Sequence, residues 1–434
     1  MIAALVVGLA VAGFPDSAAT PITLAEAVRL AQQNAPAAIA AHGQVRTTSA
    51  SVRSAYGAFL PNVSVSAGAS RQLPAEAGRT RIDDSGNIVV LPADPWSYNV
   101  GLSASVSLFE GGRRFFELRQ AKARSSAAEA NAVAQSFDVA FNVKQQYYAV
   151  LANREAEAAA RAQLAQAEEQ RTFSIAKVRA QNATRSDSLR AEIQVRNAEN
   201  SIADALNGIA TSEAALTRTV GTPYLVTASE TDTLSPPPVA MTDDQLRQLA
   251  DQSPNVIEAQ KAYEAAKAAK KASFTDYLPS ISMGYSRGGS GTSPDPFDPF
   301  GTSLGYNGSI RFSVGLPIFN QFQREAQVVG ADVALDNAEA QLRDAQLAAR
   351  SGLTSALGSY RTSEQKLEAQ ILTVEAAEED LRVQRRRYEL GGSTLLDVLS
   401  SQAQLDQARL DLIRARFDMR VARAQLETIV GREL

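Results

Sequence analysis

The 434-residue sequence contains no cysteine and a single histidine, His42. Without cysteine the chain cannot form disulfide bridges, thiolate metal sites, iron–sulfur clusters or cysteine nucleophiles. A Ser-His-Asp triad or a multi-histidine metal site would have to be built around His42 alone. We therefore expect no catalytic site, no metal site and no cofactor in this protein.

Basic charge and aromatic side chains are also scarce. The 43 basic and 47 acidic side chains give a net charge of -4, whereas nucleic-acid-binding domains are usually basic. Aromatic residues make up only 6% of the chain, which is low for the dense core of a globular protein, while alanine is abundant. The composition therefore argues against a nucleic-acid-binding protein and against a small, compact enzyme.

Long hydrophobic runs are absent, and the longest apolar stretch, residues 1–14, lies at the N-terminus and is followed by small residues. This pattern is typical of a secretory signal and is shorter than the roughly 20 residues that cross a bilayer as a helix. A buried apolar helix is the alternative. We expect residues 1–19 to be a signal peptide and, because no cysteine follows them, no lipid anchor. A membrane protein without a spanning helix has to cross as a closed β-barrel.

The chain is internally duplicated. Residues Phe59–Val65 match Tyr277–Met283 at an offset of 218 positions. A second set matches at an offset of 210: Thr184, Asp187, Leu189, Gln194, Ala198, Leu216 and Gly221 with Thr394, Asp397, Leu399, Gln404, Ala408, Leu426 and Gly431. We predict two repeats, residues 20–221 and 242–434, joined by a crossover linker over residues 222–241.

Each repeat ends in a pair of long helices. The segment from Arg113 to Asn207 contains no glycine and no proline and is rich in Ala, Glu, Gln and Arg, a composition that favours helix. The first helix of this pair would span on the order of 100 Å. A helix of this length is too long for a compact globular domain. We predict the helix pairs over residues 113–220 and 320–430, with small residues at helical spacing for close packing.

Four segments alternate between apolar and small polar residues, about 61–71, 97–109, 279–287 and 306–317. Strands of about ten residues with this alternation are typical of membrane-spanning β-barrels, although a half-buried soluble sheet alternates as well. The secretory start and the long loops between the strands of each pair favour the barrel. Four strands cannot close a barrel, so several chains must contribute.

From about Thr20 to Leu434 the sequence resembles the outer-membrane efflux protein (TolC) family. The motifs that carry the resemblance are Leu60-Pro61-Asn62, Leu278-Pro279-Ser280, Leu108 to Arg113, Leu316 to Asn320, and Arg387 to Leu399. The resemblance implies a homotrimer with one twelve-stranded β-barrel, four strands per chain, in the outer membrane of a Gram-negative bacterium. A long α-helical barrel would continue it into the periplasm.

The function implied by the resemblance is that of an exit channel. An inner-membrane RND or ABC transporter and a periplasmic adaptor protein would supply drugs or small molecules, and outer-membrane lipid would surround the barrel. The exit channel of a type I protein secretion system has the same fold and is the alternative. A periplasmic coiled-coil scaffold without a pore is an alternative of another class.

The resemblance also places a gate at the turn of the second helix pair. Asp397 matches a pore-facing acid, Leu396 an apolar constriction, and Tyr388 the position that ties neighbouring helices shut. Ser400 stands where many relatives carry a second acid, which implies one acidic ring rather than two. For Asp397 alone, a capping role in the first turn of a helix is the alternative.

The adaptor would dock at the tips of both helix pairs. The second tip contains Leu390, Gly391 and Gly392, and the first contains Ala180, Gln181 and Asn182 at the matching positions. Glycine permits the tight turn that Gly391 has to make. The first tip lacks this glycine, and asparagine tolerates the left-handed conformation, so we expect Asn182 to adopt it.

Overall fold

The computed structural model describes residues 19–71, 80–82, 85–86, 88–90, 96–229, 241–293 and 304–434. The expected signal peptide, apart from its last residue, and most of the expected crossover linker lie outside these residues. The chain divides into two compact units. The first comprises residues 1–45, 128–258 and 343–434, and the second comprises residues 46–127 and 259–342.

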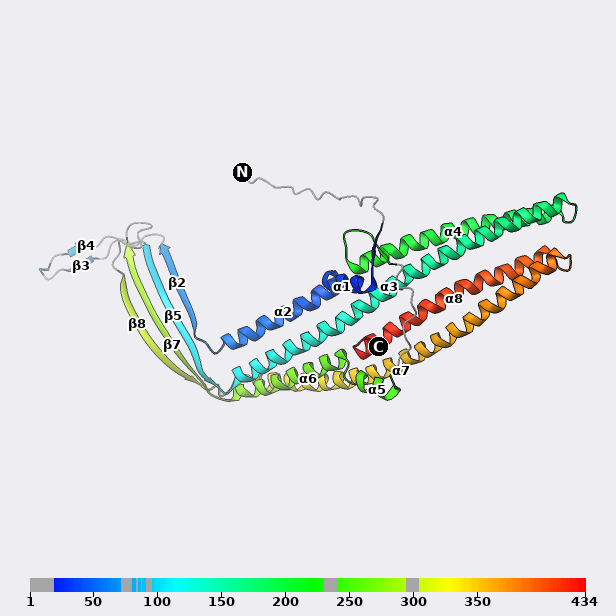
Figure 1. Ribbon diagram of the computed structural model, residues 1–434. Helices are drawn as coiled ribbons and strands as arrows, with labels where there is room; N and C mark the ends of the chain where they lie inside the picture. Colours follow the sequence, from blue (N-terminus) through cyan, green and yellow to red (C-terminus); the bar gives the residue numbers. More distant parts are fainter. Residues whose placement is uncertain are drawn as a thin grey trace. The chain divides into compact units, whose positions relative to one another are not determined.

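The helices and strands follow one another in the order expected for two repeats (Figure 1). In the first repeat they are β1 (Thr20–Ile22), α1 (Leu24–Asn34), α2 (Pro36–Gly57), β2 (Asn62–Arg71), β3 (Thr80–Ile82), β4 (Ile88–Val90), β5 (Trp96–Glu110), α3 (Arg113–Arg179) and α4 (Arg185–Val220). After β6 (Val226–Ala228) come α5 (Asp243–Ala250), α6 (Pro254–Ser273), the 3-10 turn η2 (Phe274–Tyr277), β7 (Ser280–Ser293), β8 (Gly305–Gly315), α7 (Gln323–Glu389) and α8 (Leu395–Val430).

The long helix pairs have the same dimensions in both repeats. Helices α3 and α7 each contain 67 residues, and α4 and α8 each contain 36. Alanine, glutamine and charged residues with high helix propensity fill them, and α3 has neither glycine nor proline in its interior. The predicted fold class, long helices with a few strands in an internal tandem repeat, is confirmed.

The first unit has its core where α1, α3, α4 and α8 meet. Tyr147 and Val143 of α3 and Leu216 of α4 are fully buried there, together with Phe417 of α8. The Tyr147 hydroxyl donates to the carbonyl of Ile22 at 3.1 Å. This carbonyl belongs to β1, which pairs in parallel with β6 in a small sheet that the sequence did not indicate.

Four antiparallel strands of the second unit form one sheet in the order β2-β5-β7-β8. Strand β7 continues to Ser293, beyond the expected end at about residue 287. The short pair β3 and β4 forms a separate sheet within what the sequence predicted as a loop.

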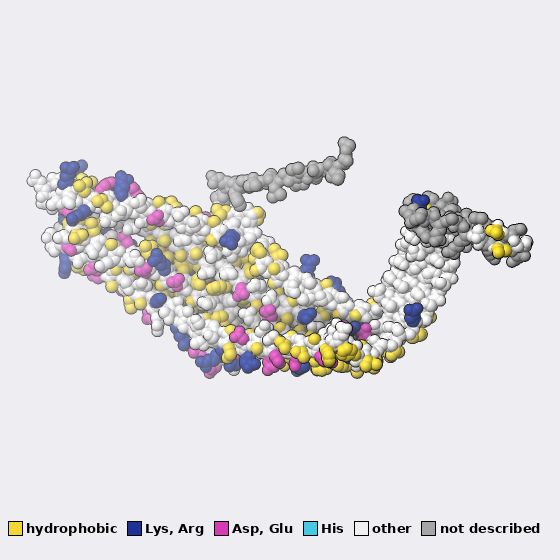
Figure 2. All heavy atoms as spheres, turned by 180° about the vertical axis from the view of Figure 1, so that it is seen from behind, with side chains coloured by type: hydrophobic (Ala, Val, Ile, Leu, Met, Phe, Trp, Pro, Cys, Tyr) yellow, Lys and Arg dark blue, Asp and Glu magenta, His cyan; other side chains and the backbone are white. Residues whose placement is uncertain are grey.

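The pairing register gives the main sheet two different faces. One face carries mainly serine and glycine, with asparagine in three of the strands. Serine hydroxyls pair across it, as Ser64 does with Ser103 and Ser282 with Ser313, both at 2.7 Å. The other face carries apolar residues: Val63, Val65, Leu102, Val106, Met283, Ile310, Phe312 and Val314. The side of the sheet seen in Figure 2 is almost without hydrophobic side chains.

Among the described residues, most of the apolar face of the sheet is exposed, apart from the buried Tyr98. Val65 of β2 and Val314 of β8 are 79% and 71% exposed, and every residue of both strands is exposed. In the described part of the chain, no helix is both long and apolar enough to cross a membrane.

Candidate functional site

Both helix tips are built on the same backbone turn. At the second tip the N–H of Gly391 donates to the carbonyl of Tyr388 at 3.3 Å, and that of Gly392 to the carbonyl of Arg387 at 2.8 Å. At the first tip Gln181 donates to Val178 at 3.1 Å, and Asn182 to Lys177 at 2.9 Å. This pair of hydrogen bonds is the Schellman motif, which satisfies carbonyls at the end of a helix. Each tip is therefore a defined turn of five residues.

The residue with the left-handed backbone at the first tip is Gln181, with φ of 61°, and not Asn182 as the sequence predicted. Its counterpart Gly391 has φ of 78°. In a Schellman motif the left-handed residue is the one that follows the helix cap, and Gln181 occupies that place. The place of a residue in the motif thus decides which residue adopts the left-handed conformation, even though asparagine tolerates this conformation better than glutamine.

Identical capping boxes begin the helices that follow both turns. The Thr394 hydroxyl accepts from the N–H of Asp397, and the Asp397 carboxylate accepts from the N–H of Thr394 at 2.8 Å. Thr184 and Asp187 repeat this exchange. Hydrogen bonds from the threonine N–H and then its hydroxyl hold the pKa of both aspartates below the usual value. Asp397 therefore has the capping role that was the alternative to a pore-facing acid.

Three of the expected gate residues lie together at the start of α8. Leu396, Asp397 and Ser400 are all exposed and fall within about 100° of the helix circumference. Leu390, Gly391 and Gly392 at the second tip and Ala180, Gln181 and Asn182 at the first are exposed as well. These surfaces are open to a neighbouring chain or to a partner.

Tyr388, the fourth gate residue, is buried apart from these three, with an exposed fraction of only 8%. It belongs to a cluster with Leu381, Leu395, Val398 and Leu405 under the second tip. Burial, with the charge of Asp187 adding to it, raises the pKa of Tyr388. The phenol oxygen itself forms no hydrogen bond to any described residue.

Lys177 of α3 ties the first tip to Tyr388 of the second. Its Nζ lies 3.7 Å from the centroid of the Tyr388 ring and donates to the Tyr388 carbonyl at 2.8 Å. Phe173 contacts the same ring edge-on at 6.0 Å between centroids. A cation over an aromatic face contributes about 0.5–2 kcal/mol. Tyr388 therefore contacts α3 through its aromatic ring and its backbone carbonyl, and not through its hydroxyl.

Lys177 is one of four residues of α3 that form polar contacts to α7 or α8 at intervals of eleven positions, and we call this set the polar ladder. Its other members are Lys144, which pairs with Glu427, Glu155, which accepts from Arg416 at 2.9 Å, and Gln166, which accepts from Gln402 at 2.7 Å. Eleven residues make just over three turns of helix, so the four side chains lie nearly along one line of α3.

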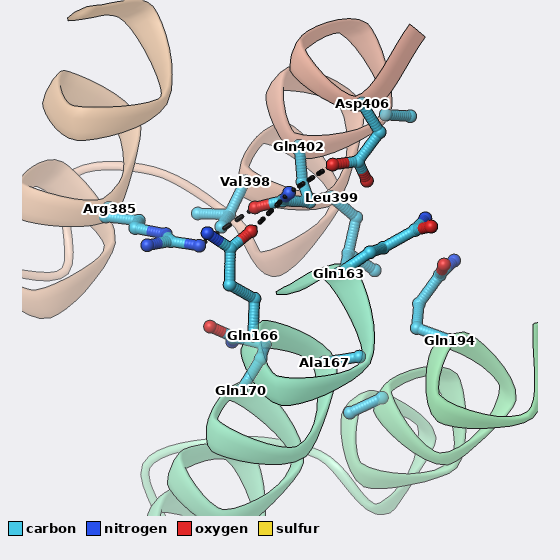
Figure 3. A pocket seen from close by; sticks show the side chains of 12 residues that line it. Gln163, Gln166, Ala167, Gln170, Gln194, Arg385, Val398, Leu399, Gln402 and Asp406 are labelled. Atoms are coloured by element: carbon cyan, nitrogen blue, oxygen red, sulfur yellow. Dashed lines mark hydrogen bonds between the residues drawn. The ribbon is translucent and has the colours of Figure 1, made fainter. Parts of the chain in front are cut away.

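The third rung of the polar ladder is a small polar network (Figure 3). Gln402 is at its centre: its side-chain oxygen accepts from Arg385 at 2.8 Å, and its nitrogen donates to Gln166 and, at 2.8 Å, to Asp406. A cavity of about 60 Å³ adjoins these side chains and is lined also by Gln163, Gln170 and Gln194. Such a polar cavity has room for a few water molecules.

Asp406 is half-buried at this cavity. Burial raises its pKa, although hydrogen bonds from Gln402 and Gln163 and the charges of Arg409 and Arg385 act in the opposite direction. A carboxylate in this setting takes up a proton more readily than one in water. The network therefore contains a group whose charge depends on pH.

The sequence did not point to the polar ladder or to Asp406. The only signal of the polar ladder in the sequence was the eleven-residue spacing along α3, which becomes visible once the helix is known to be continuous. Among the described residues, no group of three or more His, Asp or Glu side chains is arranged to hold a metal ion.

Comparison with known proteins identifies relatives over most of the chain. The profile of the family described as "Outer membrane efflux protein" matches residues 27–222 and 246–432. The toluene efflux pump outer membrane protein TtgC of Pseudomonas putida is 28% identical over 204 residues, which are 46% of this chain and 40% of that protein. The matched region thus spans less than half the length of this relative.

Two further matches extend over nearly the whole chain. Protein CyaE of Bordetella pertussis is 26% identical over 402 residues, covering 89% of this chain and 79% of that protein. The crystal structure of the outer membrane protein VceC from Vibrio cholerae superimposes with a TM-score of 0.74 at 17% identity, covering 94% of this chain and 96% of that one. At this identity the structural match establishes the fold.

Proposed function

The chain belongs to the outer membrane efflux protein family, and from this we propose that it is the outer-membrane exit channel of a tripartite efflux system. It would carry drugs or other small molecules, delivered by an inner-membrane pump and a periplasmic adaptor, from the periplasm to the outside. The name of TtgC as part of a toluene efflux pump supports efflux as the process. The observation that carries the proposal is the sheet with one apolar face and one serine face.

The sheet supports a barrel made by three copies of the chain. Within the described residues, its outer strands β2 and β8 are each paired on one side only, and unpaired strand edges favour pairing with another chain. Three copies of a four-stranded sheet give the twelve strands of the proposed barrel. The exposed apolar face would then contact lipid and the serine face would line the pore.

The gate of this channel would lie at the second helix tip. Leu396, Asp397 and Ser400 are exposed at the start of α8, where three copies would bring them together around the axis. Tyr388 would hold the closed position through the contact of its ring with Lys177. The adaptor would dock on the exposed turns at Gln181 and Gly391.

The mass and conductance of the purified protein test the channel itself. In detergent we expect the mass of a homotrimer, and in a planar bilayer we expect discrete conductance steps. A monomer that gives no conductance at any voltage contradicts the proposal.

The role of Asp397 at the gate needs a control for its capping role. Asp397→Asn removes the charge but keeps an oxygen that can accept the Thr394 N–H, and Asp187→Asn does the same at the first tip. We expect only Asp397→Asn to raise the resting conductance. Equal effects of the two variants would assign Asp397 to helix capping alone.

A further inference from the structure

The serine face of the sheet carries one charged side chain that no described residue neutralises. In the four strands of the main sheet, the charged residues on this face are Glu110 and Arg311. Glu110 pairs with Arg113 at 3.6 Å and with Arg114 at 3.3 Å. Arg311 is exposed and forms neither a hydrogen bond nor an ion pair with any described residue.

The other arginines of these strands are placed differently. Arg71 and Arg287 lie on the apolar face, where their guanidinium groups lie 5.7 Å from the ring centroid of Trp96 and 5.9 Å from that of Tyr306. Such stacking suits an arginine whose stem lies along an apolar surface. Arg311 has no aromatic partner in the described part of the chain, so its charge is available to solutes on the serine face.

The neighbours of Arg311 leave its charge unobstructed. Across the sheet it is in register with Gly284 and then with Ser105. Its neighbours on the same face of β8 are Ser309 and Ser313, whose hydroxyls pair with Ser286 and Ser282. Only small, neutral side chains therefore surround a permanently charged guanidinium.

We propose that Arg311 sets the charge preference of the exit barrel and favours the passage of anionic small molecules over cationic ones. This inference rests on the proposed function, since three copies of the chain would place three arginines at one level of the pore. Rings of arginine or lysine are a common basis of anion preference in pores. The low-dielectric wall of a barrel strengthens their effect on passing ions.

The local charge preference can be measured beside Arg311 because the chain has no cysteine of its own. Ser313→Cys introduces one thiol on the same face, two positions along β8. We expect a negatively charged, membrane-impermeant thiol reagent to modify it faster than a positively charged one of similar size. Adding Arg311→Gln should lower the ratio of the two rates on the order of twofold to fivefold. An unchanged ratio overturns the inference.

Two controls separate this inference from the proposed function. Phe312→Cys places the thiol on the apolar face, where we expect the impermeant reagents to react slowly in the membrane-embedded protein. If Phe312→Cys and Ser313→Cys react equally fast, the pore-lining serine face itself is contradicted. If Ser313→Cys alone reacts and Arg311→Gln leaves the rate ratio unchanged, the pore stands and only the role of Arg311 fails. Ser309→Gln, which removes no charge from the same face, should leave the ratio as it is.

Discussion

The two helix tips have the same backbone but are stabilised in different ways. Both combine a Schellman turn with a threonine–aspartate capping box. Beneath the second tip lies the apolar cluster of Leu381, Tyr388, Leu395, Val398 and Leu405. The positions of the first tip at the same offset are Arg171, Val178, Arg185, Ser188 and Val195. The first tip therefore has the local turn without the core beneath it.

This difference shows that local sequence signals suffice to form the turn. The apolar packing beneath it then adds stability at the second tip only. The first tip gains some stability from the second, because Lys177 and Phe173 near the first tip both contact the Tyr388 ring. A change at Tyr388 should therefore loosen both tips, whereas a change at Gln181 should affect only one.

The largest effect is expected from Tyr388→Ala, which removes the ring shared by both tips. Replacing a buried aromatic side chain by alanine costs about 3 kcal/mol of unfolding free energy, and we expect a lower melting temperature and a higher resting conductance. Tyr388→Phe is the matched control, because the hydroxyl forms no hydrogen bond. If Tyr388→Phe were as damaging as Tyr388→Ala, the ring contact could not be the main one.

An exchange of the left-handed residues should affect the tips in opposite directions. Gln181→Gly relieves a strained backbone and should stabilise the protein by about 1 kcal/mol, while Gly391→Gln should destabilise it by about 1 kcal/mol. Gly391 has no atom near the position of an added Cβ, so the cost there is backbone strain alone. Thermal unfolding of both variants in detergent checks this, and changes of the same sign would refute the shared turn.

The capping boxes offer a comparison in which the tips should respond alike. Thr184→Ala and Thr394→Ala each remove a cap worth about 1 kcal/mol, and their shifts in melting temperature should agree. Because the pKa of Asp187 and of Asp397 is lowered in the folded chain, their stabilisation is complete above pH 4 and is lost as the pH falls further. Both threonine variants should therefore weaken the acid sensitivity of unfolding, measured from pH 5 to pH 2.

The smallest expected effect concerns Asp406, whose counterpart at the matching position of α4 is the exposed Arg196. Because the pKa of Asp406 is raised in the folded chain, its contribution to stability is fully present below about pH 4 and is lost as the pH rises through the folded value. Asp406→Asn should remove this part of the pH dependence between pH 4 and pH 7. Melting curves that keep the same slope in the variant would exclude Asp406 as its source.

The fold class could be predicted because its signals extend over many residues. The segment from Arg113 onward has no glycine or proline for 95 positions, and the strands alternate over about ten residues. Strands β1 and β6 were missed because they contain only three residues each, which is too short for a periodic pattern. The family resemblance is confirmed, and it was carried by motifs at the ends of strands and helices.

The candidate site was less predictable from the sequence. The turn at Gly391 and the capping role considered for Asp397 could be predicted from local signals. The left-handed backbone of Gln181 was not predicted, because it depends on the position of this residue in the Schellman motif. Lys177 and Gln402 have partners on another helix more than two hundred residues away, and Gln402 also accepts from Arg385 across the turn. Contacts of that kind depend on how helices are placed in space. The gate roles of Leu396, Asp397 and Ser400 stay predictions.

The polar ladder has a consequence for how the long helices of such a protein can change in length. Because its rungs recur every eleven residues, an eleven-residue unit added to α3, with matching units in the other long helices, would lengthen the bundle by roughly 16 Å. Every rung beyond the insertion would face nearly the same direction as before, whereas an addition of nine residues, for example, would turn the following rungs by roughly 180°. The spacing of the ladder thus allows the length of the long helices to change in units that preserve its contacts.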